Sequence, residues 1–423
     1  MSGRIPVTRV AVDAGSLVTK IAVSGGRSGP SAQEPLLHSG AAGPDRERTA
    51  LAAALDAARE NRASQTGSDA GIHVSLVVPD AWLDGSTEGA RRQEALRHLA
   101  EDQMGLTEVS WAGQLAAAVA LATSRRGFAE PGRYLVCDIG GHGVRAAACE
   151  VTGRTVRPLA VHDAPGGGWL DFDAAVRTTL KADSDPGLAT WYRSAVDQQR
   201  RATLVFDRAR NAPEFLDARA YSLAGAAGRY ELTAGQAVSC FAPTADRLRA
   251  GSAAVLGGAA PAVAVLTGGL AWFPQAHQVV AEAAGRAPDV LGPEAAVLGA
   301  LLLGGGEAQL APHGLPPVTL PAHRIRDGRL EEISLPLPWT DSFASPDGEP
   351  LVLEDPELTL DIGSRRVTLR VPGLTRGQYR IGVRPSWPGT GVVVLRARRT
   401  PPDHADPGHD VHVLPLDSQE ILR

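Results

Sequence analysis

Two glycine-containing turns that follow an aspartate constrain the fold of this chain more than any other feature. Asp13-Ala-Gly15-Ser16 and Asp138-Ile-Gly140-Gly141 each close a short apolar strand and lead into another. Such a turn leaves backbone N–H groups free to face an anion, and glycine lets a phosphate approach because it has no Cβ. An aspartate beside the turn repels bare phosphate, which predicts a metal ion or metal-bound water between them. Two such turns, far apart in the chain, predict a nucleotide held between two related half-domains.

The composition is ordinary for a globular protein. The 423 residues are 43% apolar and 21% charged, and the formal net charge is −5. This length allows two or three domains with their own cores. The negative charge gives no reason to expect nucleic acid or an anionic membrane surface as a partner.

Cysteine usage and hydropathy indicate a cytoplasmic protein without a membrane span. Cys137, Cys149 and Cys240 lack the spacing of metal ligands, and we expect buried, reduced thiols. The first residues lack the apolar segment of a signal peptide. Residues 250–281 carry no charged side chain, but their glycines and prolines predict a helix end, a loop, a strand and a turn.

The first ~300 residues alternate strand and helix patterns in two halves, which predicts an α/β fold with two lobes. In the first half, residues 5–23 predict a strand pair, residues 24–46 a loop, and residues 47–62 a helix. An alanine-rich helix starting at Gln114 is expected to pack closely within the first lobe. Beyond Gly306 proline becomes dense and short alternating strands recur, which predicts a small antiparallel β-sandwich.

Taken in order, several segments resemble the actin-like ATPase superfamily, and most closely the nucleotide-binding domain of the seventy-kilodalton heat-shock chaperone (DnaK-type) family. The segments that carry the resemblance are Val10–Ser16, Val77-Val-Pro79 with Arg91-Arg-Gln93, Asp138–Gly141, Gly166–Asp171, Ala264–Gly269 and Gly292–Ala300. A single motif of this kind would be weak support, whereas the ordered series is specific. The resemblance does not extend to the C-terminal hundred residues.

The resemblance implies a duplicated mixed sheet flanked by helices, followed by the β-sandwich. The nucleotide-binding part is expected over residues 1–306. Its lobe I spans about 1–128 plus a closing helix at 290–306, and lobe II spans about 130–289. A linker at 307–317, a β-domain at 318–416 and a tail at 417–423 complete the chain.

Roles carry over residue by residue. Asp13 and Asp138 would hold Mg²⁺ through water. Lys20 would contact phosphate, as the lysine of actins does, and Gln114 would face the attacking water. A neutral glutamine orients water but is a poor base, so we expect slow hydrolysis or none. The remaining nucleotide contacts implied by the resemblance are Gly15, Ser16, Gly140, Gly141, Gly166, Gly167, Gly268, Gly269 and Trp272; the catalytic set would be Gln114, Asp138 and Lys20.

The chain departs from the chaperone pattern at several positions. Gly143 and Arg145 replace a threonine and a second aspartate. Arg145 has two interpretations, a phosphate contact or a surface pair with Glu150. Trp272, where chaperones use an arginine, either stacks on the base or fills core space. Asp171 is interpreted as a cap of the helix that follows the glycine-rich turn.

These observations predict an ATP-binding, heat-shock-chaperone-like protein. Its nucleotide state would control lobe closure and the binding of a protein partner or client through the β-domain. One alternative is a non-hydrolysing regulatory or scaffold module of the same fold. Another is a filament-forming actin relative, and a sugar kinase is the least favoured. The linker is not strongly apolar, which argues against its docking onto the lobes as a strand.

Overall fold

A computed structural model describes most of the chain. The described residues are 8–14, 18–24, 36–41, 46–64, 72–83, 87–104, 106, 108–226, 228–310, 317–326, 329–337, 351–353, 357–371, 374, 376–386, 390–397 and 411–416. Within them, no helix combines the length and the apolar character that a membrane crossing requires.

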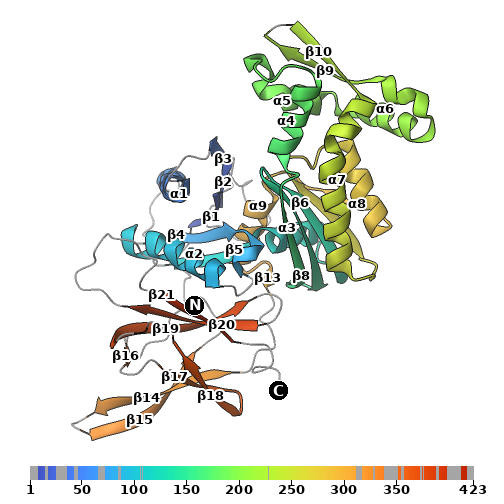
Figure 1. The fold of residues 1–423 in the computed structure, drawn as a ribbon. Coiled ribbons are helices and arrows are strands. Elements are labelled where there is room, and N and C mark those ends of the chain that lie inside the picture. The colour runs from blue at the N-terminus through green and yellow to red at the C-terminus, as the bar shows by residue number, and fades with distance from the viewer. Residues whose placement is uncertain are drawn as a thin grey trace.

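The first lobe is built on a five-stranded mixed sheet (Figure 1). Its strands are β1 (Thr8–Ala14), β2 (Val18–Ser24), β3 (Leu36–Ala41), β4 (Ile72–Val78) and β5 (Glu108–Gly113). The order is β3-β2-β1-β4-β5, with β1, β2 and β3 antiparallel and with β4 and β5 parallel to β1. The expected loop at 24–46 is therefore wrong in part, because β3 lies within it. β3 is an edge strand that pairs with β2, and its short sequence pattern alone gave little indication of a strand.

Helices complete this lobe. They are α1 (Arg46–Ser64), the 3-10 helix η1 (Asp80–Leu83) and α2 (Thr87–Arg97), which continues as a π-helical segment η2 (His98–Gln103). Small alanine side chains let α1 lie close on the sheet, where Leu51, Ala54 and Ala58 are buried against Val10 and Val12.

The second lobe repeats the same sheet plan. Its strands are β6 (Gly132–Ile139), β7 (Gly143–Thr152), β8 (Thr155–Pro165), β11 (Val263–Gly268) and β12 (Asp289–Val290). They lie in the order β8-β7-β6-β11-β12, with β6, β7 and β8 antiparallel and with β11 and β12 parallel to β6. Both strand order and strand direction match the first sheet position by position, so the two lobes are a structural duplication.

A largely helical layer extends from the second sheet (Figure 1). It comprises α4 (Trp169–Thr179), η3 (Pro186–Thr190), α5 (Trp191–Asp197), α6 (Gln199–Asn211), η4 (Pro213–Asp217), the hairpin β9 (Arg219–Gly225) and β10 (Gly228–Thr233), α7 (Ala234–Leu256) and α8 (Pro274–Ala284). Phe172, Phe206, Tyr221, Phe241 and Phe273 form its aromatic core. The helix end and the strand predicted within residues 250–281 are present as the end of α7 and as β11, so this uncharged stretch belongs to the core and is not a membrane span.

Two helices pack between the lobes, and one of them contacts both sheets. These are α3 (Gln114–Arg125) and α9 (Ala295–Gly304), which pack against each other. Helix α9 lies on β1, β2 and β4 of the first sheet, whereas α3 also contacts β6, β7, β8 and β11 of the second. The expectation that the alanine-rich helix packs within lobe I alone is therefore too narrow. Alanine on every face lets α3 approach both sheets at once.

The C-terminal strands form two four-stranded antiparallel sheets. One contains β15 (Arg329–Leu337), β14 (Val318–Arg326), β17 (Glu357–Ile362) and β18 (Arg365–Arg370); the other contains β16 (Leu351–Leu353), β19 (Gly377–Ser386), β20 (Thr390–Ala397) and β21 (Val411–Leu416). Leu320 and Leu360 of the first sheet share one core with Ile381 and Val393 of the second. The predicted β-sandwich is confirmed.

A short strand joins the two parts. β13 (Gln309–Leu310) pairs in parallel with β8, and the Gln309 N–H donates to the Arg154 carbonyl at 2.9 Å. Ala308, just before it, is buried. The linker thus adds a strand to the second sheet, contrary to the sequence-based expectation. Backbone hydrogen bonds at a free sheet edge provide this pairing, so an apolar run was not required.

Candidate functional site

Three glycine turns meet at the end of β6. The Gly269 N–H donates to the Ile139 carbonyl at 2.9 Å, and the Trp169 N–H donates to the Gly140 carbonyl at 2.9 Å. A Cβ on Gly168 would lie 2.6 Å from the Gly141 carbonyl oxygen, so only glycine allows this approach. The turns at 140–143, 166–168 and 268–269, which the sequence placed far apart, therefore form one surface.

Backbone conformation explains two of these glycines. Gly166 and Gly167 have φ of +79° and +72°, in the left-handed region that side chains disfavour. The Asp171 carboxylate accepts a hydrogen bond from the Gly167 N–H, at the start of α4. Asp171 therefore stabilises the turn from the first turn of α4; the N-cap position itself is Gly168, so the interpretation of Asp171 as the helix cap is wrong in detail.

The first lobe contributes a paired aspartate and lysine. Asp13 lies near the end of β1, opposite Lys20 in the β1–β2 register, and the Lys20 Nζ is 3.1 Å from Asp13 Oδ2. Gln114, the first residue of α3, donates from Nε2 to Asp13 Oδ1 at 2.9 Å. The structure thus brings three predicted site residues into contact. Gly15 and Ser16 lie outside the described residues.

Arg145 connects these groups to the second lobe. In the sheet register it lies between Asp138 on β6 and Asp163 on β8. Its Nη1 is 3.7 Å from Asp138 Oδ2, its Nε is 3.6 Å from Asp163 Oδ1, and Nη1 also donates to Gln114 Oε1. The surface pair with Glu150 is wrong, because residues five apart on one strand face opposite sides of the sheet.

A continuous polar chain therefore runs from Lys20 through Asp13, Gln114 and Arg145 to Asp138. Burial raises the pKa of Asp138, and Arg145 and Lys20 offset part of that effect. Burial alone would lower the pKa of Lys20, but Asp13, together with Asp138 and Glu294, more than compensates and the pKa is raised. Lys20 therefore stays protonated, and the site holds two fixed cations, one from each lobe.

Asp80 stabilises the start of α3, the helix that carries Gln114, and was not predicted as a site residue. Its carboxylate is 2% exposed and accepts from the Leu115 N–H at 2.9 Å, so it caps the start of α3. Burial raises its pKa to about 6. The only signal in the sequence was its place directly after the strand-ending Pro79.

Asp163 and Glu294 were also not anticipated. Asp163 reaches Arg145 from β8, and Glu294 at the start of α9 contributes to raising the pKa of Lys20. The first depends on the pairing register of β7 with β8, which the sequence alone does not provide.

The predicted magnesium site does not fit this arrangement. Asp13 uses one oxygen for Lys20 and the other for Gln114, while Asp138 faces Arg145. In the part of the chain that the structure describes, no group of three or more histidine, cysteine or acidic side chains is arranged to hold a metal. Two carboxylates can suffice for a hydrated Mg²⁺ on phosphates, but these two are already paired with cations.

Trp272 follows the Gly268-Gly269 turn and packs into the aromatic core. Its ring lies 6.3 Å from Tyr221 and 5.8 Å from Phe273, edge to face in both cases. Gln199 donates to its carbonyl at 2.8 Å. Filling core space is thus a role that the structure shows; stacking on a base stays a prediction.

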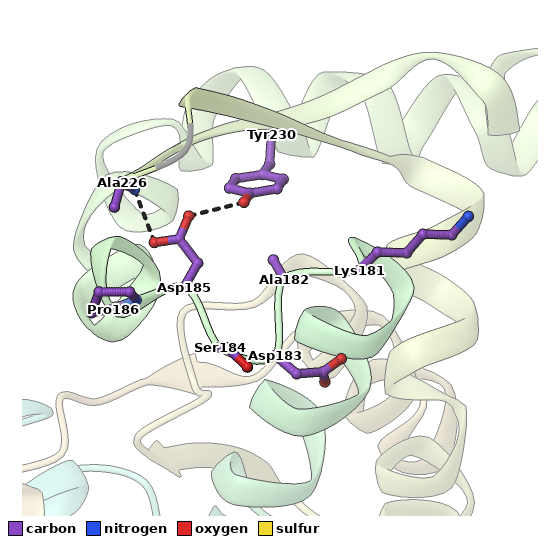
Figure 2. A pocket seen from close by; sticks show the side chains of 8 residues that line it. All are labelled: Lys181, Ala182, Asp183, Ser184, Asp185, Pro186, Ala226 and Tyr230. Carbon is purple, nitrogen blue, oxygen red and sulfur yellow. Dashed lines mark hydrogen bonds between the residues drawn. The ribbon is translucent and has the colours of Figure 1, made fainter.

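A separate hollow of about 400 Å³ lies in the outer layer of the second lobe (Figure 2), and none of its lining residues belongs to the glycine turns. Asp185 is its central acid, and Figure 2 shows its carboxylate turned toward Tyr230 and the Ala226 backbone. It accepts from the Tyr230 hydroxyl, the Ala226 N–H and the Gly187 N–H at 2.9, 2.9 and 2.7 Å. These bonds hold the β9–β10 hairpin to η3, so the acid has a structural role.

The comparisons with known proteins add little to this geometry. No family model and no curated protein sequence matches the chain. Among 487 similar chains of known structure is the ethanolamine utilization protein EutJ from Carboxydothermus hydrogenoformans, at 17% identity and a TM-score of 0.42. The match covers 70% of this chain and 90% of that one. A TM-score of this size carries no weight here.

The duplicated sheet order decides the fold class instead. The chain is a two-lobed α/β protein with a duplicated mixed sheet and a C-terminal β-sandwich. This is the architecture that the resemblance to the actin-like ATPases implied.

Proposed function

We propose that this chain binds ATP between its lobes, as a DnaK-like cytoplasmic protein with slow or absent hydrolysis. The observation that carries the proposal is the meeting of three glycine turns with Lys20 and Arg145 at one place. Glycine turns offer close backbone approach, and the two cations offer charge to the phosphates. Gly15, Ser16 and Gly141 would donate N–H groups, whereas the Gly140 N–H donates to the Gly143 carbonyl at 3.0 Å, so Gly140 would only allow close approach. Gly268, Gly269 and Trp272 would face the nucleoside.

The contacts of Gln114 support weak hydrolysis. Its amide nitrogen donates to Asp13 and its oxygen accepts from Arg145. An amide held at both ends orients a water molecule only if one of these bonds opens. It also lacks the basicity to take a proton from that water.

Nucleotide state would reach the β-sandwich through the strand pairing of the linker. β13 lies on β8, and the other end of β8 carries Asp163, which contacts Arg145. A phosphate that moves Arg145 would therefore act on the strand to which the linker is paired. We place the binding of a protein partner or client on the β-sandwich.

ATP binding by isothermal titration calorimetry tests the proposal. Lys20→Gln should weaken ATP binding by about tenfold or more, the equivalent of ~1.4 kcal/mol. Lys181→Gln is the matched control, because Lys20 and Lys181 are the chain's two lysines and Lys181 lies in the outer hollow. Equal loss in both variants, or no ATP binding by the wild type, would refute the proposal.

A single-turnover assay then separates the chaperone-like function from its alternative. Slow ADP formation favours an ATP-gated protein, whereas tight binding without turnover favours a regulatory or scaffold module. Both polar atoms of the Gln114 side-chain amide are already hydrogen-bonded, and this observation favours the regulatory or scaffold module. A filament-forming relative would show light scattering that depends on ATP.

A further inference from the structure

Arg145 has more hydrogen-bonding capacity than its surroundings use. Its guanidinium is mostly buried, and its Nε has no hydrogen-bond acceptor among the described residues. The distances of 3.7 Å to Asp138 and 3.6 Å to Asp163 are those of ion pairs rather than hydrogen bonds. A buried donor without an acceptor is rare in a folded protein, which indicates that a water molecule or a ligand supplies the acceptor.

The chemistry of the missing acceptor follows from the guanidinium. Its planar set of N–H donors matches the oxygens of a phosphate, often through two parallel hydrogen bonds. Asp138 and Asp163 flank the group in the sheet and hold it in place. They act as positioning residues, since each is close enough to fix the charge and too far to saturate the donors.

The charges in the site argue against a metal ion. Lys20 and Arg145 are paired with Asp13 and Asp138, the two carboxylates that would otherwise face a divalent cation, while Asp163 and Glu294 lie behind these cations. A phosphate chain brings the opposite charge and finds one cation on each lobe. The arrangement therefore suits a polyphosphate that carries no magnesium.

We propose that the phosphates of the ligand bind here without a metal ion, with Arg145 and Lys20 supplying the positive charge. This rests on the proposed function for the identity of the nucleotide, but the phosphate site itself does not require the base. The ligand class is a metal-free polyphosphate, either free or as part of a nucleoside triphosphate.

Calorimetry in EDTA and in excess magnesium tests the inference directly on the intact chain. Wild type should bind ATP with dissociation constants that agree within about threefold in the two buffers, a difference of ~0.7 kcal/mol or less. Arg145→Gln should weaken binding in EDTA by about tenfold or more. Arg249→Gln is the matched control, because Arg249 is an exposed arginine on α7 paired with Asp246.

Tripolyphosphate in EDTA, as a second probe, separates this inference from the nucleotide proposal. If ATP binds only with magnesium, the inference is overturned and the ATP proposal stands. If tripolyphosphate binds in EDTA and ATP does not, the nucleotide proposal fails and the metal-free phosphate site stands. If neither probe binds in either buffer, both fail.

The comparison of the two buffers uses wild-type protein and so does not depend on whether a variant folds. Arg145→Lys provides a second variant that keeps the charge and loses the planar fork. It should retain part of the affinity for tripolyphosphate in EDTA, more than Arg145→Gln does. Full retention by Arg145→Gln would overturn the inference.

Discussion

Gly299 of α9 lies directly against the backbone of Ala117 in α3, with no room for a Cβ between them. This contact sets the distance between α9, on the first sheet, and α3, which contacts both sheets. The site depends on it, because Gln114 starts α3 and Glu294 precedes α9.

Gly299→Ala should destabilise the protein. In an open helix this change would stabilise by about 1 kcal/mol through helix propensity. Here the added methyl group must push the helices apart, at a cost of about 1–3 kcal/mol. Urea denaturation of variant and wild type measures the difference. A variant as stable as the wild type, or more so, would show that the helices are packed less tightly than described.

Asp80 should make stability depend on pH in an unusual direction. Its folded pKa of about 6 lies above the ordinary value of 3.8, so the folded state binds the proton more tightly. The associated stability is fully present below about pH 4 and is lost as pH rises through 6, to a total on the order of 3 kcal/mol.

The Asp80→Asn variant isolates this effect. Asparagine keeps an oxygen that accepts from the Leu115 N–H and has no charge to bury. Between pH 4.5 and 7 (about the span of the titration) wild type should lose stability relative to the variant. Free energies of unfolding that run parallel over this range would contradict the assignment.

Gln309→Pro should release the linker strand. Proline removes the N–H that donates to Arg154, and with it about 1 kcal/mol of local stability. Amide hydrogen exchange at Thr155 and Val156 of β8 should become roughly fivefold faster. Gln309→Ala keeps the N–H and serves as the control; equal exchange in both variants would mean that the strand pairing contributes nothing.

The three cysteines should resist alkylation in the folded protein. All three are free and buried, and burial raises the pKa of Cys137 to about 11 and raises those of Cys149 and Cys240. Because the thiolate is the reactive form, a maleimide at neutral pH should modify them slowly until urea is added. Rapid modification of one thiol without denaturant would locate an opening near that strand or helix.

Local signals predicted the glycine turns, and the structure shows why. Gly140, Gly166 and Gly268 follow or precede strands whose apolar residues are recognisable in the sequence, and their order matched a known series. Asp13, Lys20 and Gln114 also came from such motifs, and they are in contact. Their roles toward a ligand stay predictions.

Features that depend on pairing could not be predicted in this way. Arg145 and Asp163 meet only because β7 and β8 pair in one register, and β3 and β13 become strands because a neighbour offers its edge. Asp80 caps a helix that begins 34 residues later in the chain. Contacts between residues so far apart in the chain produce no periodic pattern in the sequence of the segments that make them.

The pairing of β13 with β8 also limits how far the β-sandwich can move from the second sheet. Seven residues, 311–317, separate Leu310 from the first strand of the sandwich. Fully extended, the eight Cα–Cα steps from Leu310 to Val318 span roughly 26–29 Å, at about 3.3–3.6 Å for each step. The sandwich packs its strand β21 against α2 of the first lobe, so anything that it holds is confined to a small volume beside the two lobes, where its effective concentration is high. Detachment of β13 would lengthen this tether and dilute whatever it carries.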